Sequence, residues 1–154
     1  MDLILAPVKE EIDRYSVFLA GSIEQGKAVD WQKDIAASLE DLDGVLLSPR
    51  RDNWDADWPN DPDFSEFRQQ VEWELEHIKL SDTVFFYFQP DTLSPISLLE
   101  LGLVLGEGRK PVIVCPEGFW RRGNVLITAE QYGVEVLGSL EEGVDILRKT
   151  IENR

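Results

Sequence analysis

The sequence has little cysteine, little histidine and little positive charge. Its 154 residues include one Cys and one His, and 15 Lys and Arg stand against 30 Asp and Glu, for a formal net charge of -15. One cysteine excludes an internal disulfide, which is typical of a reducing compartment, so we expect a cytoplasmic protein. A zinc site is not expected, and we predict neither a metal nor an organic cofactor. The acidic charge argues against binding to nucleic acid or to an anionic membrane, because both need basic patches.

Long apolar runs are also missing. No stretch reaches the length of a membrane span, and the start, MDLILAPVKEEIDRYS, lacks the basic beginning and apolar centre of a signal peptide. The chain length predicts one domain over residues 1–154, which is enough to bury a core. We therefore expect a globular protein with a small substrate that is neutral or only locally charged.

Short apolar runs alternate with helical patterns along the chain. Strands are expected at Ser16 to Gly21, Gly44 to Pro49, Thr83 to Phe88, Pro111 to Cys115 and Gly133 to Gly138. Helices are expected at Asp30 to Leu42, Phe64 to Asp82, Ser94 to Gly108 and from Ser139 onward. Strands that are apolar almost throughout are typical of a parallel sheet covered on both faces, so we predict an α/β fold with five parallel strands and helices on both faces. Ligands of such sheets bind at the carboxyl ends of the strands.

The helix expected at SPISLLELGLVLGEG is apolar except for one carboxylate in its middle, Glu100. Ile96, Leu103 and Val104 share its face, and no cation lies three or four residues away. A buried carboxylate without a partner is costly. Because this helix leaves the carboxyl edge of the sheet, Glu100 is in position to face the ligand crevice as a nucleophile or general acid. The alternative is a structural Glu bonded to a neighbouring hydroxyl or backbone amide.

Four segments stand out in order along the chain: FLAGSIEQGKAVDWQ, SPRRDNWD, LSDTVFFYFQPDT and PISLLELG. Together they resemble the motifs of the nucleoside 2-deoxyribosyltransferase-like family, from about Val17 to Asn124. Four motifs in the right order are more specific than any one of them. The resemblance implies a flavodoxin- or Rossmann-like three-layer sandwich and a salvage reaction that moves a 2-deoxyribosyl group between nucleobases. In the family the Glu of an ELG sequence is the nucleophile, which implies that role for Glu100.

The implied chemistry retains configuration through two displacements at C1′. A carboxylate attacks to give a glycosyl-Glu100 intermediate, and a second base reverses the step. The resemblance also implies an acidic residue eight positions before the Asp that opens the third strand, to manage the proton of the departing base. Counting back from Asp82 reaches Glu74. The alternative for Glu74 is a solvated helix-face charge, as expected for Glu72 and Glu76.

Five substrate-binding candidates follow from the resemblance and from the loops at this edge: Ser22, Trp54, Asp91, Ser94 and Asn124. Ser22 matches the family's GS turn, and Asp91 and Ser94 precede the catalytic helix. Asn124 matches an Asn that, in the family, reaches a neighbouring subunit's site and binds the 5′-hydroxyl. The ring of Trp54 is able to stack on a base. The alternatives are turn formers for Asp91 and Asn124, a helix N-cap for Ser94, and loop packing or an interface for Trp54.

The resemblance thus implies 2′-deoxynucleosides and free nucleobases as substrates, and a homo-oligomer whose active sites are completed around Asn124. The segment GFWRRGNV favours an interface, because aromatic residues and Arg are enriched at interface centres. The alternative is that Phe119 and Trp120 fold back over their own domain.

Two other functions stay open. One is an N-glycoside hydrolase of 2′-deoxynucleosides or their 5′-monophosphates. Phosphate binding is favoured by Arg50-Arg51 and Arg121-Arg122 and disfavoured by the acidic Glu24 in GSIEQG. The other is a non-catalytic nucleotide-sensing or scaffold domain in which Glu100 is only structural.

Overall fold

The computed structural model describes residues 1–23 and 29–154, so Glu24 lies outside the described residues. The strands in chain order are β1 (Asp2–Leu5), β2 (Ser16–Gly21), β3 (Val45–Ser48), β4 (Thr83–Tyr87), β5 (Val112–Val114) and β6 (Val136–Leu137). The helices are α1 (Trp31–Ser38), α2 (Ser65–Leu80), α3 (Pro95–Gly106), α4 (Arg122–Gln131) and α5 (Leu140–Glu152). Within the described ranges, none of these helices has the length and apolar character needed to cross a membrane.

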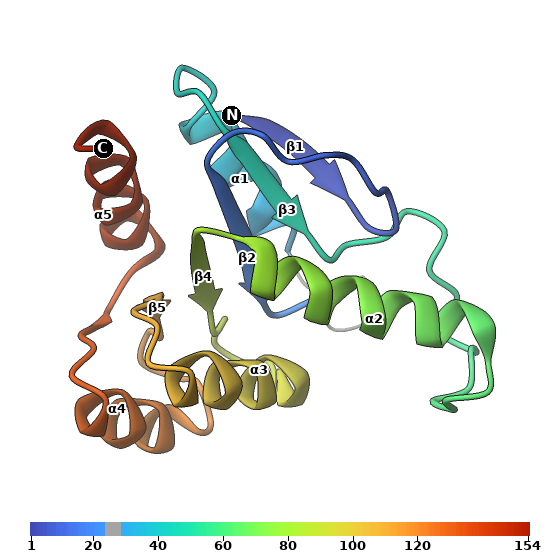
Figure 1. Ribbon diagram of the computed structural model, residues 1–154. Helices are drawn as coiled ribbons and strands as arrows, with labels where there is room; N and C mark the ends of the chain where they lie inside the picture. Colours follow the sequence, from blue (N-terminus) through green and yellow to red (C-terminus); the bar gives the residue numbers. More distant parts are fainter. Residues whose placement is uncertain (24–28) are drawn as a thin grey trace.

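The strands form one parallel sheet in the order β1-β3-β2-β4-β5-β6 (Figure 1). The predicted parallel α/β architecture is confirmed, but the prediction of five strands is wrong, because the described part of the chain forms six. The missed strand is β1, which pairs with β3 from Asp2 opposite Val45 to Leu5 opposite Ser48. This four-residue edge strand is exposed or half-buried. Its extended form depends on a partner some forty residues away, so local periodicity does not indicate it.

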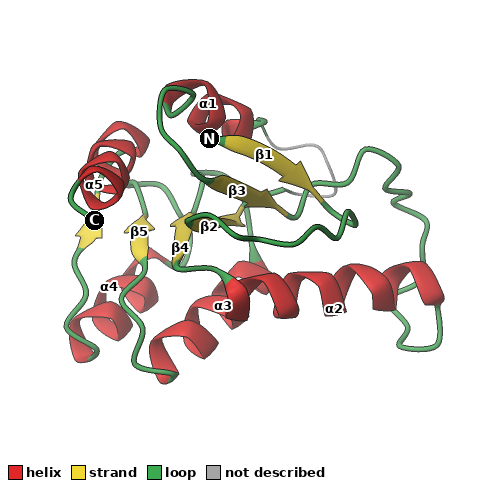
Figure 2. Ribbon diagram, turned by 45° about the horizontal axis from the view of Figure 1, so that its top comes forward, coloured by secondary structure: helices red, strands yellow, loops and turns green. Residues whose placement is uncertain are grey.

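Helices cover both faces of the sheet, as predicted. In Figure 2, α2, α3 and α4 lie on one side and α1 and α5 on the other. Alternate residues of β2 serve the two sides: Phe18 and Ala20 pack with α2, α3 and α4, whereas Val17 and Leu19 pack with α1 and α5. The sheet is therefore the rigid middle layer between two apolar cores.

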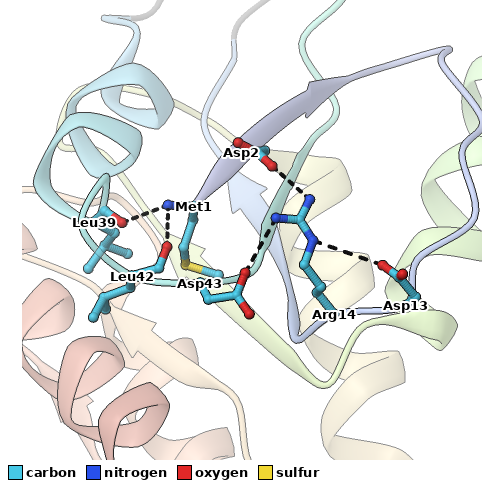
Figure 3. A network of polar contacts seen from close by, with 7 residues as sticks. All are labelled: Met1, Asp2, Asp13, Arg14, Leu39, Leu42 and Asp43. Carbon is cyan, nitrogen blue, oxygen red and sulfur yellow. Dashed lines mark hydrogen bonds and ion pairs between the residues drawn. The ribbon is translucent and has the colours of Figure 1, made fainter.

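Polar contacts tie the edge strand to the end of α1 (Figure 3). The Met1 ammonium donates to the carbonyls of Leu39 at 2.8 Å and Leu42 at 2.7 Å. A cation at the carboxyl end of a helix offsets the partial negative charge of the unpaired carbonyls. Arg14 pairs with Asp2 at 2.7 Å, but this pair is exposed and therefore contributes little to stability.

Gly143 of α5 lies directly against the sheet. A Cβ atom there would come within 2.4 Å of Val114 Cγ2 and 2.8 Å of Phe85 Cζ. We expect Gly143→Ala to lower the free energy of unfolding by about 1–3 kcal/mol, because overpacking outweighs the better helix propensity of Ala. Gly123→Ala in α4 is the control, since its Cβ would meet nothing within 4 Å. Urea denaturation checks both variants, and an unchanged Gly143→Ala protein would contradict the close packing of α5.

Candidate active site

Glu100 lies on the side of α3 that faces the protein interior and is only 6% exposed. Ser97 and Val104 of the same helix are buried beside it. Ile96 and Leu103, by contrast, are 53% and 45% exposed. The apolar helix is therefore buried on one side only. The sheet and α2 cover one side of α3, and the rest of its apolar surface faces outward.

A second carboxyl group, that of Glu74 on α2, lies close enough for its charge to act on Glu100. Burial raises the pKa of Glu100 well above its usual range, and the Glu74 carboxylate raises it further. Burial also raises the pKa of the partly exposed Glu74 to about 7, against the opposing effect of a hydrogen bond from Gln70. Two such groups resist being ionised together, so the pair retains a proton near neutral pH. The two predicted catalytic residues are thus brought together.

Gln70 anchors Glu74 to the end of a strand. Its Nε2 donates to Glu74 Oε1 at 2.8 Å and to the Pro49 carbonyl, just after β3, at 2.7 Å. Gln70 is not among the site residues predicted from the sequence. The available signal was its position four residues before Glu74, since residues i and i+4 meet on one helix face.

Three hydroxyl groups join the end of β2 to the start of α3. Ser22 Oγ lies 2.5 Å from Ser94 Oγ and 2.6 Å from Thr92 Oγ1, and the Gln89 backbone N–H donates to it at 3.1 Å. Ser94 does occupy the N-cap position, with Pro95 at the first helical position. Ser94 makes no side-chain capping hydrogen bond at this position, because it has a φ of 46° and its hydroxyl bonds to Ser22 and Thr92.

The other two candidates from the edge loops lie farther out. Asp91 is exposed with a φ of 62°, a conformation in which Asp is enriched among non-glycine residues, so its role as a turn former is supported. Trp54 is half-buried, with its ring centroid 5.1 Å from that of Trp58, which in turn contacts Phe64 at 5.9 Å. Trp54 therefore packs within an aromatic cluster of its own loop.

Asn124 does not join the carboxyl pair within its own chain. It is exposed in the first turn of α4, so its interpretation as a turn former is wrong. It lines a groove of about 530 Å³ between α3 and α4, together with Leu98 and Gly102. These two residues stand two positions from Glu100 on either side and therefore lie on the opposite face of α3.

The two aromatic residues before α4 behave differently from each other. Phe119 is buried, with its ring centroid 5.0 Å from that of Phe88, so it belongs to the core and its predicted place in an interface is wrong. Trp120 is exposed, donates from Nε1 to the Leu93 carbonyl at 2.9 Å and carries the Arg121 guanidinium over its ring. Only Trp120 of this pair presents a large apolar surface beside the groove.

The sequence matches a family of known proteins. The sequence matches the family model described as nucleoside 2-deoxyribosyltransferase like over residues 14–119. The chain belongs to this family. The match includes Glu74 and Glu100 and ends before Asn124. The correspondence of Asn124 to an Asn of the family therefore rests on the resemblance stated above and not on this match. The general class of a nucleoside deoxyribosyltransferase-like enzyme is thereby supported.

A solved structure shares the fold of this nucleoside 2-deoxyribosyltransferase-like protein. A crystal structure of a conserved protein from Enterococcus faecalis V583 matches with a TM-score of 0.58 and 12% sequence identity, covering 89% of this chain and 99% of that chain. At this identity the likeness shows a shared fold only. No curated protein matches the sequence.

The raised pKa of Glu100 predicts how stability changes with pH in this family member. Between the ordinary carboxyl pKa of 4.5 and the raised value, the native state binds more protons than the unfolded state, so stability falls as pH rises. We expect Glu100→Gln to raise the thermal midpoint of unfolding at about pH 8. This increase should vanish at about pH 4, where the carboxyl group is largely protonated in both the native and the unfolded protein. Thermal denaturation across this range is the measurement.

Glu72→Gln is the matched control, because it removes the same charge from an exposed position on α2. It accounts for the general relief of repulsion in a chain of net charge -15. Its effect should stay within about 0.5 kcal/mol. A Glu100→Gln protein less stable than wild type at alkaline pH would contradict the unfavourable ionisation of Glu100.

Proposed function

We propose that this protein transfers the 2-deoxyribosyl group between nucleobases, with Glu100 as the nucleophile and Glu74 as the acid and base. The observation that carries the proposal is that the buried carboxyl group of Glu100 on α3 lies within electrostatic reach of the half-buried carboxyl group of Glu74 on α2. Burial raises the pKa of both groups, so we expect the pair to keep a proton near neutral pH. The reaction needs that protonation state, because one group must be a carboxylate to attack C1′ and the other an acid to protonate the leaving base.

In the first step a Glu100 oxygen bonds to C1′ while the bond from C1′ to the base nitrogen breaks, and Glu74 gives its proton to the base. In the second step the incoming base nitrogen bonds to C1′, Glu74 takes its proton, and Glu100 leaves as a carboxylate. Burial favours the proton on Glu100. The positive charge that develops at C1′ favours ionised Glu100, so the proton passes to Glu74 as the reaction begins. Two inversions retain the configuration.

Contacts around the arginines support an unphosphorylated substrate. Arg50 Nε lies 3.2 Å from Asp30 Oδ1 and donates to Gln32 Oε1 at 2.9 Å. Arg122 Nε donates to the Cys115 carbonyl at 3.1 Å. These bonds within the chain occupy donors that a 5′-phosphate would need. The burial of Glu100 supports transfer over hydrolysis, because it limits the access of water to a glycosyl ester.

Further substrate contacts are proposed around the carboxyl pair. The hydroxyls of Ser22 and Ser94 stand at the carboxyl ends of the strands, where ligands of parallel sheets bind. Asp91 lies in the exposed turn that leads into α3, and Trp54 lies in the loop between β3 and α2, where its ring is available to a base.

Removal of either carboxyl group tests the roles. With thymidine and adenine as substrates, we expect Glu100→Ala to lower the rate of deoxyadenosine formation by about 10⁴-fold or more, because the covalent route is lost. Glu74→Gln should lower it by about 10² to 10⁴, the usual contribution of a general acid. The exposed Glu72→Gln should stay near the wild-type rate. Chromatography of the products is the measurement.

The products of the wild-type protein distinguish the alternatives. Free thymine without deoxyadenosine would indicate a hydrolase, and tight binding without turnover would indicate a sensor. Near-normal base exchange by Glu100→Ala would show that the nucleophile has been assigned wrongly.

We also propose a homo-oligomer in which Asn124 acts on the site of a neighbouring chain. The position of Asn124 on the far side of α3 from its own Glu100 supports action in trans. Trp120, which lines the groove, and the exposed apolar side chains of Ile96 and Leu99 on α3 supply surface for such a contact.

Mixing two inactive variants tests this arrangement. Glu100→Ala and Asn124→Ala proteins are unfolded together and refolded as mixed oligomers, with each variant refolded alone as the control. We expect the mixture to regain up to about a quarter of the wild-type activity in a dimer, because one random site in four receives both intact residues. A monomer in light scattering, or no recovery after confirmed mixing, would exclude a site shared between chains.

A further inference from the structure

Both hydrogen-bond donors of the Gln70 side-chain amide have partners, but its acceptor oxygen has none among the described residues. Both hydrogens of Nε2 are directed to acceptors, Glu74 Oε1 and the Pro49 carbonyl. Gln70 is only 5% exposed. Its Oε1 is buried and has no hydrogen-bond partner among the described residues.

The orientation of this amide follows from its neighbours. The Pro49 carbonyl can only accept a hydrogen bond, and the Glu74 carboxylate accepts one as well, so the amide must present its NH2 group to them. A flipped amide would set its oxygen against two other oxygens. The unpaired atom is therefore the carbonyl oxygen, and a buried carbonyl is normally satisfied.

The place of this oxygen indicates what binds to it. Gln70 is bonded to Glu74, which exchanges a proton with the base in the proposed function, so under that proposal the amide is a neighbour of the base. A ligand that satisfies Oε1 must bring an N–H or O–H donor. The edge of a nucleobase carries amino and ring N–H groups of this kind.

We infer that Gln70 selects the base: Oε1 accepts a hydrogen bond from an amino or ring N–H group on the base edge, while Nε2 positions Glu74. This inference rests on the proposed function. One side chain then couples recognition to proton transfer, because the base that satisfies Oε1 also fixes the amide that holds Glu74. Bases without a donor at that edge leave the buried oxygen unpaired and are rejected.

The test uses two series of free bases, each ending in a base that lacks the edge donor. They are adenine, hypoxanthine and purine, and cytosine, uracil and 2-hydroxypyrimidine. Binding is measured by calorimetry and exchange by kcat/KM, for wild type, Gln70→Met and Gln69→Met. Gln69 is the matched control because it is the exposed neighbour of Gln70 on α2.

In at least one series we expect wild type and Gln69→Met to prefer a donor-bearing base by about tenfold or more, and Gln70→Met to lose that preference to within about twofold. If the role of Gln70 were only structural, Gln70→Met would weaken the binding and exchange of all bases equally. Gln70→Leu, a second apolar replacement of similar size, should lose the preference in the same way, which maintains the test if Gln70→Met does not fold.

An unchanged preference in folded Gln70→Met, or no preference in wild type, would overturn the inference and leave an ordered water as the partner of Oε1. The same follows if wild type binds none of the six bases. A Gln70-dependent preference in binding without any exchange of bases would retain the inference about Gln70 and overturn the proposed transfer.

Discussion

Two carboxyl groups held together in a buried site oppose folding unless the surrounding structure compensates for them. Burial and mutual repulsion both disfavour the ionised form of Glu100, and burial acts in the same direction on Glu74. The compensation comes from the apolar core between the sheet and helices α2, α3 and α4, which buries α2 and α3 through other residues such as Trp73 and Leu105. Apolar packing elsewhere in the protein offsets the free-energy cost of burying the pair. As a consequence of their raised pKa values, the two groups keep a proton at a pH at which ordinary carboxyl groups are ionised.

The same site is held by the carboxyl ends of three neighbouring strands. Gln70 links α2 to the residue after β3, and the hydroxyls of Ser22 and Ser94 link the end of β2 to the start of α3. The backbone N–H of Gln89, just after β4, donates to the same Ser22 hydroxyl. Since the strands form one continuous sheet, the two carboxyl-bearing helices are positioned from a rigid frame, as precise chemistry requires.

The outward side of α3 has a different character from the side that holds Glu100. Ile96, Leu99 and Leu103 of α3 are exposed, and Trp120 is exposed beside the groove that Asn124 lines. One helix therefore presents a carboxylate to its own core and an apolar surface to the outside. The apolar composition of α3 therefore does not mean that the helix is buried on all sides.

The sequence by itself determined the alternation of strands and helices and the single carboxylate in an apolar helix, whereas Glu74 was indicated by the resemblance to the nucleoside 2-deoxyribosyltransferase-like family, counted back from Asp82. These features follow from local periodicity and short motifs, which a single segment carries. Only the tertiary structure decided that β1 joins the sheet and that residues 122–131 form α4, which buries Val125 and Ala129. It alone shows that Gln70 is the partner of Glu74. Strand pairing and burial depend on segments remote along the chain, so local patterns do not specify them. The spacing of Gln70 and Glu74 is local, but it does not show that the two side chains bond to each other.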